Sequence, residues 1–330
     1  MMNTRVSPEP STVAIPAETG ILTTLSHLSL VRDDAGESEA IVASDSLSGI
    51  VEMLSRSPEW DGVFAWNEFE HGVVFEREPP FGDIARRGDT LKDEDITRVR
   101  LWFEKVHQVV VKKQNVLDAI RIVASCSPIH PLRAYLKSLT WDGTSRVDTW
   151  LEDFVGVKPT SPDHARLIRS VARMWLVSCV ARAMKPGSKV DSMLILEGKQ
   201  GIGKSRALGA LAGERFFSDS LIDFRTKDAC QNIQGVWIYE LAELDALLRS
   251  ENSTAKAFLT RSFDKFRAPY ARTPMVIPRS TVFAGTINHG SYRRITPATV
   301  ASGSCDVATP STWTGLAPPA ISSGRRLGSC

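Results

Sequence analysis

From residue 198 to residue 205 the chain reads Gly-Lys-Gln-Gly-Ile-Gly-Lys-Ser, and this stretch decides the fold. It fits the phosphate-binding loop pattern G-x-x-x-x-G-K-[ST] at every fixed position. Residues 193–196 before it are apolar and predict a buried strand, whereas residues 205–211 predict the first turns of a helix. Together, strand, glycine loop and helix let backbone N–H groups and a helix N-terminus surround a phosphate. The alternative is a glycine-rich turn that carries a lysine by chance.

The positions of this loop predict a site for ATP and Mg²⁺. Lys204 is expected to reach the β- and γ-phosphates, which makes it a catalytic candidate as well. The Ser205 hydroxyl is expected to coordinate the magnesium ion. The expected nucleotide-binding residues are Gly198, Gln200, Gly201, Ile202, Gly203, Lys204 and Ser205.

Two later apolar runs end in polar residues that suit ATP hydrolysis. Residues 236–239 lead to Glu240, and Glu243 follows three residues later. An acid in this place is expected to bind magnesium or to act as a general base, so both glutamates are catalytic candidates and Glu240 is also a metal candidate. The alternative for Glu243 is an acid that only stabilises the first turn of a helix. A third strand, 280–286, leads to Asn288, which either orients the attacking water or caps a turn.

Composition and charge exclude several classes of protein. Hydrophobic residues make up 42% of the chain and charged residues 24%, as in an ordinary globular protein. The net charge of +2 means that any nucleic-acid site must be a local patch. We find no apolar run long enough to cross a membrane and no secretory signal, and we expect no membrane partner. The five cysteines include no C-x-x-C pair, which favours a reducing cytoplasm over a disulfide framework or a zinc site.

Periodicity predicts an α/β protein in which a P-loop ATPase sheet follows a helical region and a small α+β N-terminal domain. Helices are expected near 47–54, 96–106, 116–124, 132–139, 149–154 and 163–184, and paired strands at 63–66 and 73–75. The expected divisions are a mostly disordered tail at 1–44, an α+β and helical domain at 45–160, a helical collar at 161–190, an ATPase core at 191–292, and a low-complexity segment at 293–330.

Two cationic patterns are candidates for contact with DNA. Residues 261–272 alternate cations with aromatic side chains, a composition typical of loops that grip a nucleic-acid backbone. The alternative is a surface hairpin whose aromatics pack inward. The DNA-contact candidates in this stretch are Lys265, Arg267 and Arg272. The second pattern is an arginine stripe on the helix at 163–184, which is interpreted instead as a solvated helix face (Arg166, Arg169 and Arg173).

Taken together, these segments resemble the virulence-associated protein E family of phages, phage satellites and genomic islands, which is akin to superfamily-three helicases and viral primase-helicases. The resemblance implies a DNA-associated ATPase, a helicase by family, that assembles as a homo-oligomeric ring and acts in the replication of a mobile element. The matching stretches are Trp66–Phe69, His130–Leu136, Trp141–Gly143, Pro186–Asp191, Leu196–Ser205, Gly235–Leu244, Lys256–Leu259, Phe266–Tyr270, Pro278–Arg279 and Gly285–Asn288.

The resemblance ends abruptly after Tyr292. Residues 293–330 contain 24 Ser, Thr, Pro, Ala or Gly residues among 38 and show no strand or helix period. The family's Gly-Asn-Arg-Arg-Phe-Trp signature is absent. Codons permitted for Arg293 to Gly303, read from the third base, nevertheless spell Pro-Asp-His-Thr-Gly-Asn-Arg-Arg-Phe-Trp. We therefore expect a frameshift or truncation after about Tyr292; the alternative is a genuine low-complexity segment.

Three hypotheses for function remain open at the level of sequence. The first is a DNA-dependent ATPase or helicase, and the second is an ATP-dependent switch that regulates a partner without moving DNA. The third is a truncated relic without catalysis. DNA-stimulated ATP hydrolysis separates the first from the second, and nucleotide binding without turnover favours the third.

Overall fold

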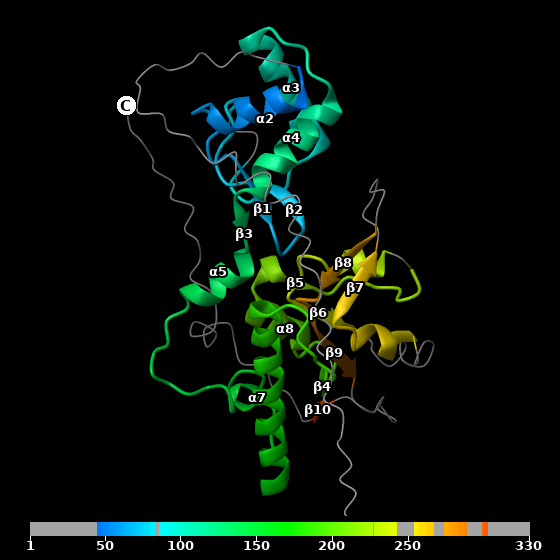
Figure 1. Ribbon diagram of the computed structural model, residues 1–330. Helices are drawn as coiled ribbons and strands as arrows, with labels where there is room; N and C mark the ends of the chain where they lie inside the picture. The colour runs from blue at the N-terminus through cyan, green and yellow to red at the C-terminus, as the bar shows by residue number, and fades with distance from the viewer. Residues whose placement is uncertain are drawn as a thin grey trace, which may run out of the picture. The chain divides into compact units, whose positions relative to one another are not determined.

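The computed structural model describes residues 45–82, 86–226, 228–242, 254–266 and 274–288, and the backbone of 299–302. These residues form an α/β structure with a parallel sheet, as the sequence predicts (Figure 1). Several predictions lie outside the described residues: the tail at 1–44, Glu243, Arg267 and Arg272.

The first elements combine helices with a small sheet. In this sheet β1 lies between β2 and β3, antiparallel to β2 and parallel to β3. Its core is aromatic: the Trp60 ring stacks on Phe64 at 5.4 Å and meets Trp102 edge to face at 5.2 Å. The predicted helices and strand pair are confirmed. The elements are α2 (Leu47–Arg56), β1 (Phe64–Asn67), β2 (Gly72–Phe75), α3 (Asp93–His107), α4 (Lys113–Ser125) and β3 (Pro128–Ile129).

A helical region follows, made of α5 (Pro131–Ser138), the one-turn helix α6 (Trp150–Asp153) and the long α7 (Pro162–Met184). His130 caps α5, because its Nδ1 accepts from the backbone N–H of Arg133. Burial, with a contribution from Arg133, lowers the pKa of His130 to about 4, so the ring is neutral at pH 7 and free to accept this bond. Ser161 caps α7 in the same way.

Each arginine of the α7 stripe forms an ion pair with an acid on the surface. Arg169 Nε donates to Glu152 at 2.9 Å, and Arg173 Nε donates to Asp148 at 2.6 Å. Arg166 forms an ion pair with Asp163 within the first turn. These pairs favour the interpretation of the stripe as a solvated helix face. The opposite face of α7 is buried, and Trp175 there donates to the carbonyl of Phe283 at 3.2 Å.

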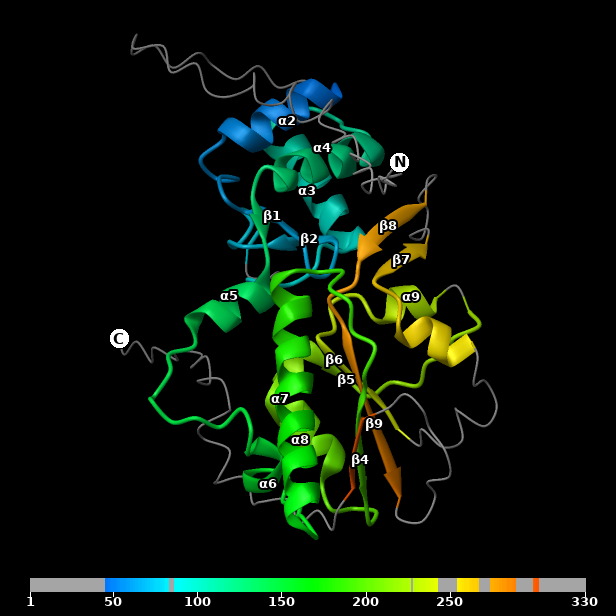
Figure 2. The same ribbon diagram turned by 60° about the horizontal axis from the view of Figure 1, so that its bottom comes forward.

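All strands of the main sheet are parallel and lie in the order β10-β4-β9-β6-β5. Alternate residues point to opposite faces, so Leu194 and Leu196 pack with α7 and α8, whereas Ile195 packs on the other side with Phe258. Figure 2 shows α7 and α8 on one side of this sheet and α9 on the other. The elements are β4 (Leu194–Gly198), α8 (Lys204–Ala212), η2 (Glu214–Phe216), β5 (Phe217–Ser218), α9 (Ala229–Asn232), β6 (Ile238–Leu241), β9 (Val282–Asn288) and β10 (Thr299–Ser302).

Strand β10 corrects the expectation that no strand follows Tyr292. Residues 299–302 pair in parallel with β4, Val300 opposite Ile195 and Ala301 opposite Leu196. The outer edge of β4 would otherwise leave backbone N–H and C=O groups unpaired, and an extended segment satisfies them whatever its side-chain period. The pairing therefore follows from the edge of β4, and the frameshift hypothesis stays untested.

Candidate nucleotide site

The loop between β4 and α8 has the backbone that its glycines predict. Gly201 and Gly203 have φ of +82° and +93°, values that favour glycine. Lys204 begins α8 and is only 7% exposed, because its ammonium group folds back over the loop. Its Nζ donates to the carbonyl oxygens of Gly198 and Lys199, each at 2.9 Å. The loop thus forms a closed turn around the lysine at the N-terminus of α8.

Glu240 lies beside this loop, inside β6 rather than at the strand tip that the sequence predicts. It is fully buried, and its Oε1 accepts from the Ser205 hydroxyl at 2.7 Å. The Thr286 hydroxyl donates to the same oxygen at 2.6 Å. Among the described side chains, Oε2 of Glu240 is one of three buried polar atoms without a hydrogen-bond partner. The carboxylate is therefore held at one oxygen and unsatisfied at the other.

Strand β9 separates the loop strand from the acid strand and contributes two polar residues. Asn288, its last residue, is exposed and pairs in register with Gly198 at the start of the loop. Thr286 lies two residues earlier, so both side chains point to the face of the sheet that α8 covers. The structure thus brings Ser205 and Glu240 of the predicted site into contact, and it places Lys204 and Asn288 beside Gly198 at the start of the loop. It adds Thr286, which sequence reasoning missed.

These residues fit a magnesium nucleotide. Gly201 borders open space, since a Cβ at this position would meet no atom within 4 Å. The orphaned carboxylate oxygen of Glu240 lies next to a serine hydroxyl, and oxygen ligands of this kind suit Mg²⁺. The described residues contain no cluster of three His, Cys, Asp or Glu that could hold a metal alone. Magnesium usually takes several of its ligands from water and phosphate rather than from protein side chains.

The DNA-contact candidate Lys265 lies on a hairpin formed by β7 (Phe263–Phe266) and β8 (Met275–Pro278). Asp264 and Ile277, which pair across the hairpin, are buried on its inner face. Lys265 and Phe263 lie on the outer face, and Phe263 is 57% exposed. The alternative interpretation predicted a surface hairpin, which the structure has. It also predicted that the aromatic side chains pack inward, which Phe263 does not do.

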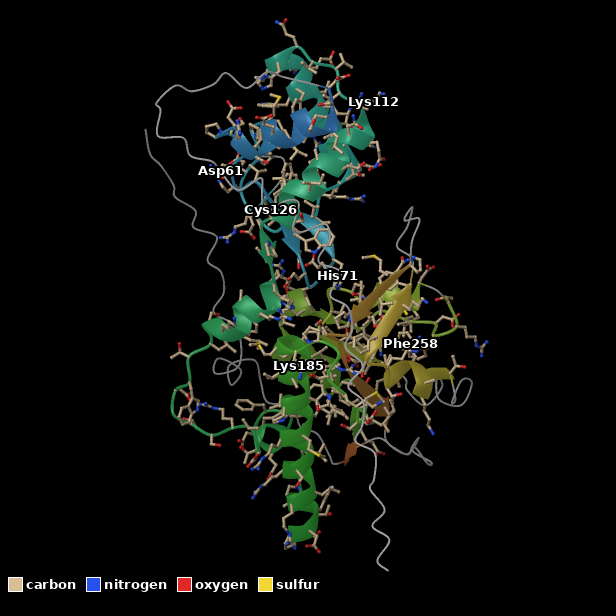
Figure 3. The ribbon with its side chains drawn as sticks, in the orientation of Figure 1. Asp61, His71, Lys112, Cys126, Lys185 and Phe258 are labelled. Carbon is tan, nitrogen blue, oxygen red and sulfur yellow. The ribbon has the colours of Figure 1, made fainter. Side chains whose placement is uncertain are left out.

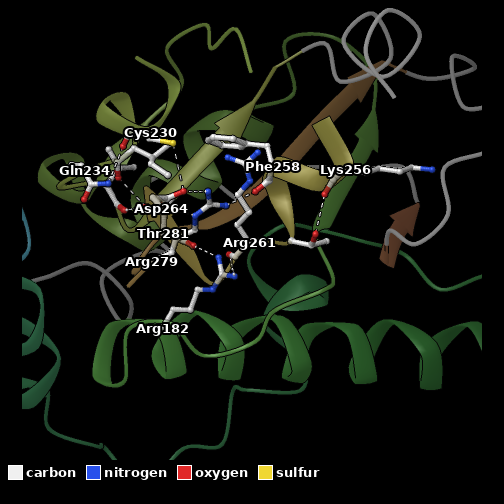
Figure 4. Close-up of polar contacts among 12 residues, drawn as sticks. Arg182, Cys230, Gln234, Lys256, Phe258, Arg261, Asp264, Arg279 and Thr281 are labelled. Carbon is white, nitrogen blue, oxygen red and sulfur yellow. Dashed lines mark hydrogen bonds and ion pairs between the residues drawn. The ribbon is translucent and has the colours of Figure 1, made fainter. Parts of the chain in front are cut away.

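A buried ion pair joins the two strands of this hairpin, and its arginine also contacts Phe258 outside the hairpin (Figure 4). Arg279 follows β8 and forms a bidentate pair with Asp264, and the two side chains are 1% and 0% exposed. Its Nη1 also donates to the carbonyl of Phe258 at 2.6 Å, and its guanidinium lies 4.6 Å from the Phe258 ring centre.

A second buried arginine, Arg182 of α7, stands nearby and donates to the carbonyl oxygens of Ser188, Thr281 and Arg261. Burial, with repulsion from Arg279 as a smaller cause, lowers the pKa of Arg182 to about 10. Two arginines thus fix the base of the hairpin from both sides.

Replacing Asp264 with alanine is expected to lower the free energy of unfolding by about 3–5 kcal/mol, because Arg279 would stay buried without its carboxylate. Urea denaturation followed by circular dichroism measures the change. Asp163→Ala, which removes the acid of an exposed pair, is the control and should change little. An unchanged midpoint for Asp264→Ala would show that the pair does not fasten the hairpin.

Comparison with known proteins supplies a family match over half of the chain. A family model described as a virulence-associated protein E-like domain matches residues 136–300. No curated protein sequence matches the chain. No helix among the described residues has the length and apolar character needed to cross a membrane.

Solved structures of the NrS-1 C-terminal region are also similar to this chain, at low identity. One A form apo structure shares 13% identity with a TM-score of 0.41, covering 77% of this chain and 62% of that one. A second apo structure shares 13% with a TM-score of 0.42, covering 85% and 67%. A further A form structure shares 14% with a TM-score of 0.34, covering 70% and 59%. The chain thus spans less than two thirds of the first of these relatives.

Proposed function

The chain belongs to the virulence-associated protein E-like family, and from this premise we propose that it is a P-loop ATPase that binds DNA in the replication of a phage or other mobile element. The observation that carries the proposal is the contact between Ser205 of the glycine loop and Glu240 of the acid strand. A serine after the loop lysine, joined to a buried carboxylate on another strand, is the pairing that a magnesium nucleotide needs.

In the proposed site, the glycine loop would bind the phosphates of ATP, and two side chains next to it would bind magnesium. The backbone of Gly198 to Ser205 and the N-terminus of α8 would hold the phosphates, and Lys204 would turn from the loop carbonyls toward them. ATP would supply the phosphoryl group. Ser205, with Glu240 as the second candidate ligand, would hold Mg²⁺, whose charge would offset that of the phosphate oxygens.

Glu240 and Asn288 are proposed to act on water. With Oε1 of Glu240 held by two hydroxyl groups, its Oε2 is the atom available either to bind Mg²⁺ or to take a proton from a water molecule. Asn288, at the end of the neighbouring strand, would orient that water. Burial of the Glu240 carboxylate strengthens its own electrostatic interactions, because solvent does not screen them.

We also propose that the protein assembles as a ring, because the family that it resembles implies this. Ring ATPases complete each site with an arginine from a neighbouring subunit, which is worth about 10³–10⁵ in rate. If a frameshift removes the Arg-Arg signature, this chain is a poor ATPase, and restoring the frame raises its turnover. The nucleotide sequence around the Tyr292 codon tests that premise directly.

The DNA part of the proposal rests on the outer face of the β7–β8 hairpin, where Lys265 and Phe263 lie together and exposed. A cation beside an aromatic ring suits a single-stranded backbone and a stacked base. The test is MgATP hydrolysis with and without single-stranded DNA, where stimulation is expected. Tight nucleotide binding without turnover or stimulation would favour a switch protein instead.

Replacing Lys265 with glutamate is expected to weaken DNA binding and to reduce the slope of log K against log salt by about one, because one phosphate contact is lost. Fluorescence anisotropy across a salt series measures both quantities. Lys105→Glu, on the exposed face of α3, makes the same charge change and is the control. An unchanged salt slope would remove the hairpin from the DNA interface.

A further inference from the structure

The motif Trp66-Asn67-Glu68-Phe69 has no part in the proposed site, yet two of its side chains, Asn67 and Phe69, are buried and make specific contacts. It forms the end of β1 and the turn into β2, beside His71, which Figure 3 labels. Asn67 is fully buried, and its Oδ1 accepts from the backbone N–H groups of Phe69 and Glu70. His71 completes the turn with a φ of 55°, unusual for a residue other than glycine. We call residues 68–71 the hairpin tip.

The hairpin tip contacts the turn that leads into the acid strand. The carbonyl of Phe69 accepts from the backbone N–H of Gly235 at 3.1 Å. The Phe69 ring, 3% exposed, lies 5.8 Å from the ring of Phe216 in η2. Glu70 lies 3.7 Å from the guanidinium of Arg215. Gly235 is five residues before Glu240 on the same continuous stretch of chain.

Only glycine allows this approach. Gly235 has a φ of +73°, and a Cβ added to it would lie 2.7 Å from Cγ of Glu70. The same turn is held from other sides as well, since the Thr281 hydroxyl donates to the carbonyls of Ile233 and Val236. The backbone N–H of Trp237 donates to Phe216 at 2.8 Å. The hairpin tip is thus one of several anchors at the entry to β6.

The contacts at the entry to β6 affect the position of this strand, because β6 pairs with β5 at only two of its residues. Strand β5 pairs only with Ile238 and Tyr239, so Glu240 and Leu241 have β9 as their described partner strand. Glu240 lies only five residues beyond Gly235 on the same stretch of chain, so a shift of the backbone at the entry to β6 would move its carboxylate as well. Glu240 must stay within hydrogen-bond distance of both Ser205 and Thr286.

We infer that the hairpin tip is a positioning element for Glu240: by holding the turn at Gly235, it keeps the acid strand aligned with the phosphate loop. This inference rests on the proposed hydrolysis for its effect on turnover. It assigns Phe69 a role beyond packing, and it makes Gly235 a position at which an added side chain lowers the rate.

The test is the variant Gly235→Ala, measured with a partner variant that removes the clash. Gly235→Ala should lower kcat about tenfold and leave the Kd for MgATP unchanged, because the phosphate loop itself is untouched. Adding Glu70→Ala removes the Cγ that the new Cβ would meet and should restore part of kcat. Gly143→Ala is the matched control, since Gly143 has a φ of +86° but no atom near its Cβ position. It should keep the parent's kcat.

Hydrogen exchange of residues 236–241 gives a readout that needs no turnover. Gly235→Ala should speed exchange there, and the double variant should slow it again. Should Gly235→Ala fail to fold, Phe69→Leu takes its place, because it keeps the apolar contact and loses the ring. Parent-like kcat and exchange in the folded variant, or no rescue by Glu70→Ala, overturns the inference. If the parent hydrolyses no ATP but exchange responds as expected, the contact stands and the proposed function fails.

Discussion

Replacing Lys204 with alanine is expected to abolish ATP turnover and to weaken MgATP binding at least tenfold, while the chain stays folded. The ammonium group is the one cation placed by the motif to meet the β- and γ-phosphates, and charge on the γ-phosphoryl oxygens grows during transfer. Its loss should therefore raise the barrier by several kcal/mol, more than any other single change in the loop. Initial rates of phosphate release and titration with a fluorescent ATP analogue measure the two effects.

The matched control is Lys199→Ala in the same loop. Lys199 is exposed, its carbonyl rather than its side chain contacts Lys204, and the change in net charge is identical. This variant should bind and hydrolyse ATP like the parent. Lys204 also donates to two carbonyls, so circular dichroism and thermal unfolding must show that the alanine variant keeps its structure. A folded Lys204→Ala variant with parent-like turnover would refute the phosphate-loop assignment.

The sequence was sufficient for the strand, loop and helix around Lys204, because glycine spacing and apolar runs are local properties. The predicted strand at 193–196 appears as β4, one residue displaced at its start, and the helix after the loop appears as α8. The order of the strands in the sheet was not predictable in the same way. It depends on which apolar faces meet in space, which no local window contains.

Thr286 shows what local reasoning misses. It lies inside the predicted third strand, two residues before the candidate at the strand end, Asn288. Its role becomes visible only when β9 is placed between β4 and β6, so that its hydroxyl reaches Glu240. The sequence did contain a clue to Thr286. Side chains in a strand alternate between the two faces of the sheet, so Thr286 and Asn288 must lie on the same face.

Asp264 and Arg279 are a second case. In the sequence they belong to a cation-aromatic stretch and a Pro-Arg pair with no evident relation. The hairpin places them together, and the pair is buried because Phe258 and Phe283 cover the guanidinium. A pair 15 residues apart leaves no periodic trace in sequence, so only the folded chain shows that one of the charges in this stretch is structural.

Replacing Glu240 with glutamine is expected to lower kcat by about 10²–10⁴ while MgATP still binds. The substitution is nearly isosteric, and the amide oxygen can still accept from Ser205 and Thr286, so the loop and strand should keep their places. What changes is the other atom: the orphaned carboxylate oxygen becomes an amide nitrogen that cannot take a proton or bind magnesium. Single-turnover hydrolysis and nucleotide binding at equilibrium separate the two effects.

Glu197→Gln is the control for this variant, because Glu197 is a carboxylate on the loop strand β4, where it pairs with Ile287 of β9. Ile287 packs on the side of the sheet away from α8, so Glu197 faces away from the proposed site. This variant should hydrolyse ATP at the parent's rate. Loss of binding together with turnover in Glu240→Gln would mean that the carboxylate mainly holds the metal. Parent-like turnover would mean that another group is the base, and Glu243 is then the first residue to test.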